Sequence, residues 1–219
     1  MGQLKLIIFD LDGTLTDSLA DLTDAVNQML LRFGRSRLTQ QEVRKLVGEG
    51  ARRLVEKALP GAAAAEIEEA LGIFLAYNEQ HIADRTVLYP GVRETLPLLV
   101  RAGRSLAVVS NKNEALCRKL LDTLGIGHHF AAVLGADSLP ERKPSPLPLL
   151  HLMERFGAGP GETAIIGDSR NDILAGQGAG IIVVGCRYGY GEEAELTAAD
   201  FRIAAFAELP SLPPFGSPP

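Results

Sequence analysis

The stretch Phe9-Asp10-Leu11-Asp12-Gly13-Thr14-Leu15-Thr16-Asp17-Ser18 closes a short apolar run that begins at Leu4. An apolar run of this length, bounded by a turn, is typical of a strand buried in a parallel sheet. Asp10 and Asp12 lie two residues apart, so both carboxylates leave the strand on the same side. Asp12-Gly13 alone would also suit an ordinary turn. Two buried acids, however, are unfavourable without a cation, and the pair therefore indicates a functional site.

Similar apolar runs recur along the chain, and helices of about ten residues separate the later ones. Alternating strands and helices predict an α/β fold with an open parallel sheet. Ligands bind such sheets outside the carboxyl ends of the strands. The further strands are expected at residues 106–109, 131–134, 164–166 and 181–184, and helices at 114–124 and 147–156.

No strand is expected between about Asp17 and Arg85. Ser18 is expected to cap a first helix, and Thr39-Gln40-Gln41-Glu42 has the pattern of a capping box for a second. A last helix is expected at about 62–82. The sequence therefore predicts an all-helical unit, residues 17–85, inserted into a core made of residues 1–16 and 86–219.

Two proline-containing segments interrupt these patterns. Pro97 falls within the helix expected after Gly91 and is predicted to kink or delay it. Residues 210–219 hold five prolines and are expected to be disordered or loosely packed. A third segment, Gly189-Tyr190-Gly191, partly resembles a dinucleotide fingerprint, but it begins too far after its strand to be interpreted as one.

Composition bounds the function. The 219 residues are 46% hydrophobic, which is enough for a substantial core, and the net charge of −5 argues against nucleic-acid binding through a general positive field. The two cysteines, Cys117 and Cys186, cannot form a disulfide framework or a CxxC metal site. No run is long enough for a membrane span or a secretory signal. We expect a cytoplasmic monomer or homodimer with neither nucleic-acid nor membrane partners.

Three further polar motifs follow expected strands. Ser110-Asn111-Lys112 follows the second core strand, Lys143 lies among prolines after the third, and Gly167-Asp168-Ser169 with Asp172 follows the fourth. Taken singly, each also suits a helix cap or a solvated lysine. Together with Asp10 and Asp12 they place four carboxylates, a lysine and neutral donors at one edge of the sheet. Oxygen ligands favour Mg²⁺, and the lysine with its neighbouring donors suits a phosphate group.

This ordered set resembles the haloacid dehalogenase superfamily, in its phosphatase branch, over nearly the whole chain. The resemblance implies a Rossmann-like core with a small helical cap inserted after the first strand. It implies that Asp10 is the nucleophile, forming an aspartyl-phosphate, and that Asp12 is the general acid/base. It also implies that Ser110, the Asn111 amide and Lys143 bind the transferring phosphoryl group.

The same resemblance implies a Mg²⁺ site. Asp10, the backbone carbonyl of Asp12 and Asp168 would bind the metal, and Asp172 would support the site through a water or from behind these ligands. The chemistry would then be hydrolysis of a phosphomonoester, because an acid two residues after the nucleophile argues against dehalogenation.

The cap is expected to choose the substrate. Its segment Gly48-Glu49-Gly50 resembles the cap loop of phosphoglycolate phosphatases, and the proline-rich run around Lys143 resembles that subfamily too. Arg52 or Arg53 could bind a substrate carboxylate, although both would also suit an exposed helix–helix turn. A small anionic phosphoester, most simply 2-phosphoglycolate, is the expected substrate.

Other functions stay open at this point. A pyrophosphatase or a phosphatase acting broadly on small nucleotide or sugar phosphates would use the same core. A β-phosphoglucomutase-like mutase is disfavoured, because Val47 and Ala51 stand where that resemblance would place a lysine and an arginine. A phosphate-binding module without turnover would be marked by loss of Asp10 or Asp12, and both are present.

Overall fold

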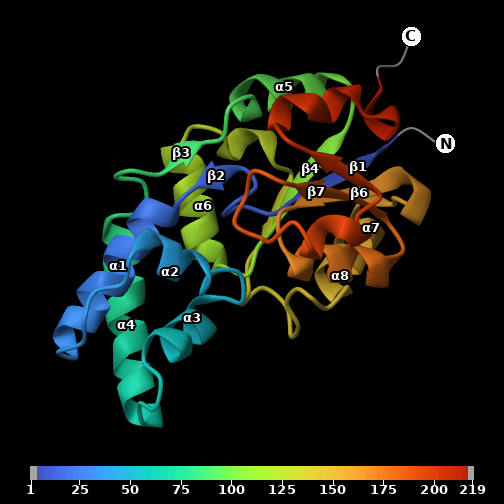
Figure 1. The fold of residues 1–219 in the computed structure, drawn as a ribbon. Helices are drawn as coiled ribbons and strands as arrows, with labels where there is room; N and C mark the ends of the chain where they lie inside the picture. Colours follow the sequence, from blue (N-terminus) through green and yellow to red (C-terminus); the bar gives the residue numbers. More distant parts are fainter. Residues whose placement is uncertain (1–3, 217–219) are drawn as a thin grey trace.

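The structure is a computed structural model that describes residues 4–216. Its centre is a six-stranded parallel sheet in the order β5-β4-β1-β6-β7-β8 (Figure 1). This confirms the predicted α/β fold; within this sheet, the sequence prediction missed the edge strand β8. The strands are β1 (Leu6–Phe9), β4 (Ser105–Val109), β5 (Ala132–Leu134), β6 (Thr163–Gly167), β7 (Ile182–Cys186) and β8 (Phe201–Ile203).

The sheet is covered on both faces. All four residues of β1 are buried, and they alternate between two apolar clusters. Ile7 and Phe9 pack on the side of α5 (Val92–Arg101) and α6 (Glu114–Thr123). Leu6 and Ile8 pack toward α7 (Leu147–Phe156) and α8 (Arg170–Ala179). Burial of both faces explains why β1 is a continuous apolar run rather than an alternating one.

Four helices form the inserted cap, with an apolar cluster of their own. In Figure 1 they lie together on one side of the sheet domain. A two-stranded antiparallel ribbon, β2 (Thr16–Asp17) and β3 (Val87–Leu88), joins them to it. The boundaries of the cap at residues 17 and 85 remain a prediction. The cap helices are α1 (Leu19–Arg32), α2 (Gln40–Arg44), α3 (Ala51–Ala58) and α4 (Ala64–Gln80).

Of the local predictions for helix ends and for Pro97, one is confirmed and the others are not. The capping box of Thr39 and Glu42 is formed. Ser18 stands at the start of α1, but its side chain does not cap the helix, because its hydroxyl donates to the Asp12 carboxylate instead. Pro97 does not delay α5, which begins directly after Gly91 and continues through the proline.

The prediction of a loose C-terminal tail is wrong for the residues up to 216. Residues 206–211 and 213–215 form two 3₁₀-helices, which have three residues per turn. Apolar side chains recur at every third residue of this segment, so they lie on the same side of the chain. Arg104 donates to the backbone carbonyl of Phe215 at 2.8 Å, and its guanidinium lies 5.8 Å from the Phe215 ring centroid. Residues 217–219, the rest of the predicted tail, lie outside the described residues. The apolar series is Phe206, Leu209, Leu212 and Phe215, all packed in or against the main cluster.

Replacing Phe215 with Ala is expected to lower the free energy of unfolding by about 3 kcal/mol, because the buried ring leaves a cavity. For a chain of this size the melting temperature should fall by roughly 6–12 °C. Thermal unfolding monitored by circular dichroism measures this, with Ser211→Ala at an exposed neighbouring position as control. Equal melting temperatures for the two variants would show that the tail does not contribute to the core.

Both cysteines, Cys117 and Cys186, are buried and unpaired. Within residues 4–216, the helices are all too short or too polar to traverse a bilayer.

Candidate active site

The carboxyl ends of the central strands bring the sequence motifs together. Asp10 follows β1, Ser110 and Asn111 follow β4, and Asp168 follows β6. The register pairs Phe9 with both Val108 and Ile166, so these strands end at nearly the same level. The strands therefore deliver their polar side chains to one edge of the sheet, as predicted.

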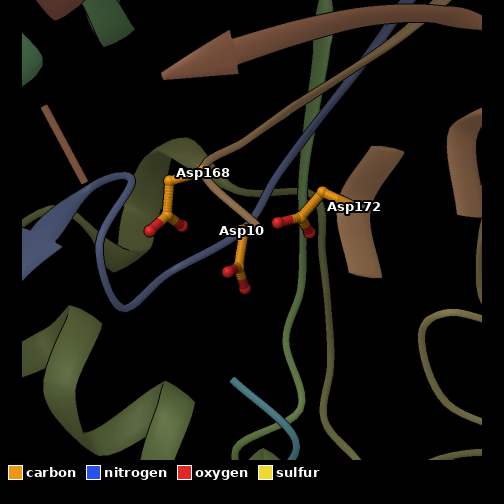
Figure 2. A group of neighbouring side chains, drawn as sticks. All are labelled: Asp10, Asp168 and Asp172. Atoms are coloured by element: carbon orange, nitrogen blue, oxygen red, sulfur yellow. The ribbon is translucent and has the colours of Figure 1, made fainter. Parts of the chain in front are cut away.

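Asp10, Asp168 and Asp172 form an acidic cluster. Each offers a carboxylate oxygen within 4.8 Å of the other two, and Figure 2 shows the three side chains turned toward a common space. All three are buried. Burial, reinforced by the charges of the neighbouring acids, raises the pKa of Asp168 above its usual range. Burial likewise raises the pKa of Asp10, although Lys143 partly offsets it.

The chain holds the outer two acids in place. Asp168 accepts hydrogen bonds from the Thr14 hydroxyl at 3.0 Å and from the backbone N–H of Tyr190 at 2.6 Å. Asp172 lies in the first turn of α8 and accepts bonds from the backbone N–H and hydroxyl of Ser169, at 3.1 and 2.7 Å. These bonds fix each carboxylate while leaving lone pairs free toward the centre of the cluster.

Lys143 is the cation inside the cluster. Its Nζ lies 2.6 Å from Asp172 Oδ1 and 2.9 Å from Asp10 Oδ1, and its side chain is only 2% exposed. The contact with Asp10 lacks hydrogen-bond alignment, which leaves Asp10 Oδ1 as a buried oxygen without a hydrogen-bond partner. Although burial works to lower the pKa of Lys143, the Asp10 and Asp172 charges hold that pKa above its usual value.

The donor set fits a hard divalent cation. The cluster brings three carboxylates together against the single positive charge of Lys143, and it offers only oxygen ligands. Burial and the neighbouring carboxylates raise the pKa values of Asp10 and Asp168, so both acids are disfavoured as anions where they stand. Metal binding by this acidic cluster is therefore consistent with its composition and geometry.

Asp12 stands apart from the acidic cluster and has a different environment. Its carboxylate accepts bonds from Lys112 Nζ at 2.9 and 3.2 Å and from the Ser18 hydroxyl at 2.6 Å. Lys112 is largely buried, with 8% of its side chain exposed. Lys112 follows Ser110 and Asn111 in the sequence, and no role for it was predicted. The hydrogen bonds from Lys112 and Ser18 hold the Asp12 carboxylate outside the acidic cluster.

Glycines allow the backbone to approach Asp168 closely. Gly13 has a φ of +89°, and a side chain there would collide with the Asp168 carboxylate. A side chain at Gly189 would collide with Asp168 and with the carbonyl of Gly13. The discounted segment Gly189-Tyr190-Gly191 thus belongs to the site, and its two glycines were the signal that could have identified it.

A pocket extends from the acidic cluster to the cap. The core lines it with Asp10, Asp12 and Lys143 among others, and the cap contributes Gly48 and Gly50. The pocket contains the predicted phosphate-binding residues Ser110 and Asn111 as well. The structure therefore brings the predicted catalytic and phosphate-binding residues and the predicted cap glycines to one cavity, while Asp168 and Asp172 do not line it.

The cap loop is hydrogen-bonded to the core through one backbone carbonyl, that of Gly48. Gly48 O accepts bonds from the side-chain amides of Asn111, at 2.9 Å, and Asn171, at 3.1 Å. Asn111 also donates to the backbone carbonyl of Lys143 at 2.9 Å. Both amide hydrogens of Asn111 are therefore in use, and its backbone N–H is the group left to serve a phosphate.

The charged residues expected to contact substrate from the cap lie elsewhere. Arg52 pairs with Glu68 at 2.6 Å, Glu49 pairs with Lys57 at 2.6 Å, and neither Arg52 nor Glu49 lines the pocket. Their proximity to the glycines in sequence does not bring their side chains to the cavity.

Comparisons with known proteins identify the family of this chain. A sequence profile of haloacid dehalogenase-like hydrolases matches residues 7–186. The chain is 39% identical to the phosphoglycolate phosphatase of Chromobacterium violaceum, over 95% of this chain and 96% of the relative. It is 44% identical to that of Pseudomonas putida, over 85% of this chain and 70% of the relative.

Solved structures agree with the sequence comparisons. A crystal structure from Haemophilus somnus, described as a predicted phosphoglycolate phosphatase, superposes with a TM-score of 0.92 at 36% identity. The match covers 96% of this chain and 98% of that one. The profile, the relatives and the shared fold lead to one conclusion: this chain belongs to the haloacid dehalogenase-like hydrolase family.

Proposed function

We propose that this chain is a Mg²⁺-dependent phosphomonoester hydrolase whose substrate is 2-phosphoglycolate. The observation that carries the proposal is the position of Asp10, which lines the pocket beside the buried Lys143 ammonium and within reach of Asp168 and Asp172. A carboxylate placed beside a buried cation and a donor-lined pocket suits nucleophilic attack on a phosphate ester.

The phosphoryl group is bound by this chain's own donors. Lys143 supplies a positive charge, and Ser110 and the backbone N–H of Asn111 supply neutral hydrogen bonds. Asp10, the Asp12 backbone carbonyl and Asp168 would hold Mg²⁺ with Asp172 beside them, and the metal supplies the charge that lets an anionic nucleophile approach an anionic ester.

Two half-reactions follow. An Asp10 oxygen forms a bond to phosphorus as the bond from phosphorus to the alkoxy oxygen breaks, and Asp12 gives its proton to the leaving oxygen. Asp12 then takes a proton from a water that attacks phosphorus, which releases inorganic phosphate and restores Asp10. Lys112 and Ser18 orient the Asp12 carboxylate for both transfers.

The substrate assignment is supported by the relatives' names and by the pocket. The relatives above that carry an activity name are called phosphoglycolate phosphatases at about 40% identity. The cap lines one side of the pocket with apolar side chains such as Leu22, Leu54 and Phe74. Val47 and Ala51 line it, and neither offers the charged groups expected of a sugar-phosphate mutase.

Phosphate release from a panel of esters tests this proposal. We expect activity with Mg²⁺, its loss in excess chelator, and a preference of at least about tenfold in kcat/KM for 2-phosphoglycolate. The panel also contains pyrophosphate, a nucleoside monophosphate and a hexose phosphate. A flat profile would contradict the substrate assignment while keeping the reaction, and full activity in chelator would contradict the role of the metal.

A further inference from the structure

One polar cap residue in the pocket, Asn78, makes no side-chain hydrogen bond within the described part of the chain. Asn78 lies on α4 and lines the pocket, and it is only 3% exposed. Within residues 4–216 its side-chain amide forms no hydrogen bond, and it is not one of the polar groups that are sealed from solvent without a partner. The amide therefore keeps contact with the space of the pocket, and its hydrogen-bonding groups are free to bind a ligand there.

Asn78 is a polar residue in an otherwise apolar part of the pocket wall. It follows Phe74 and Leu75 by one turn of helix, so the three share a face of α4. Leu22 and Leu54 complete an apolar wall on the cap side of the pocket. Among the described cap residues that line the pocket, Asn78 carries the one polar side chain.

The core determines which end of the substrate meets this wall. Asp10, Ser110 and Lys143 occupy the floor of the pocket and take the phosphoryl group, so the rest of a small ester points toward the cap. Arg52, the cap cation expected to bind a carboxylate, is paired with Glu68 away from the pocket. On the cap side of the pocket, the Asn78 amide is the group that can receive an anionic end, while the core side offers Lys112, Asn113 and Asn171 among its polar groups.

We propose that Asn78 is a specificity-determining residue whose amide N–H binds the carboxylate of the substrate. The proposal rests on the function proposed above. It goes beyond that function by assigning carboxylate recognition to a single neutral donor on α4 rather than to the arginines of the cap loop.

The test compares two esters that differ only at the end facing the cap. Ethyl phosphate has a methyl group where 2-phosphoglycolate has a carboxylate. The quantity measured is the ratio of kcat/KM for 2-phosphoglycolate to that for ethyl phosphate. We expect Asn78→Leu to lower this ratio by roughly 30-fold or more, and Asn78→Asp to lower it further through repulsion between carboxylates.

Stability provides a second readout, and Gln80→Leu is the matched control because Gln80 is an exposed amide on the same helix outside the pocket. Asn78→Leu is expected to melt at or above the wild-type temperature, because no hydrogen bond is lost and the apolar wall gains a leucine. This variant carries the test if Asn78→Asp does not fold.

The outcomes separate the two proposals. If the wild type shows no preference for 2-phosphoglycolate, the proposed substrate is wrong and the role of Asn78 falls with it. If the wild type shows the preference and Asn78→Leu keeps it within about threefold, the role of Asn78 alone is overturned. Equal losses on both esters with a lowered melting temperature would also overturn it, since they would indicate a merely structural role.

Discussion

Asp10→Asn is expected to reduce phosphate release by at least about 10⁴-fold. The amide has nearly the shape of the carboxylate, but its oxygen is a far weaker nucleophile, so the covalent route is lost. The fold should be retained. Burial raises the pKa of Asp10, which means that the folded state disfavours its charge, and a neutral residue relieves that penalty.

Steady-state phosphate release and thermal unfolding measure these two effects. Asp122→Asn makes the same chemical change at an exposed position in α6 and should leave both properties unaltered. Trapping of a phosphate that survives acid quenching and is released by hydroxylamine, as expected of an acyl phosphate, on the wild-type protein but not on Asp10→Asn would complete the assignment. Retention of activity in the purified variant would remove Asp10 from the role of nucleophile.

Lys143→Met should produce the largest loss of stability. The substitution removes the cation held between Asp10 and Asp172 and leaves buried carboxylates without it. Breaking a buried ion pair from one side lowers the free energy of unfolding by about 3–5 kcal/mol. In a chain of this length the melting temperature should fall by roughly 6–20 °C. Activity should fall as well, by about 10²–10³-fold, because a positive charge at the phosphoryl site is lost.

The measurement is thermal unfolding in chelator, so that no added metal compensates for the missing lysine. Lys119→Met is the control, because Lys119 lies on α6 with 46% of its side chain exposed. If Lys143→Met melted within about 2 °C of the wild type, the buried carboxylates would have to be neutralised by some other means.

The core of the site was predictable because its residues follow strands directly. Asp10, Ser110 and Asp168 each come within two residues of a strand end, and parallel strands carry such residues to one edge. The apolar runs located those strands, and the resemblance of the motifs to a family supplied the roles. The roles themselves remain predictions for this chain.

The cap and the tail were less predictable for physical reasons. The tail repeats its apolar residues with a period of three, which is neither the helical nor the strand period, so its prolines dominated the interpretation. Asn78 lies inside a helix without any motif, and only the tertiary position of α4 brings it to the pocket. Arg52 lies beside the cap glycines in sequence, yet it points to Glu68 on α4.

The central place of β1 in the sheet has a consequence for how the protein comes together in time. Its two neighbours are β4 and β6, formed by residues 105–109 and 163–167, and the cap helices lie between β1 and both of them in the chain. During synthesis, β1 cannot form its sheet pairings until β4 and β6 have been made. The cap helices can pack earlier, because they have an apolar cluster of their own. Such distant pairings make folding slow. The three carboxylates therefore meet only late in synthesis, after most of the chain has been made.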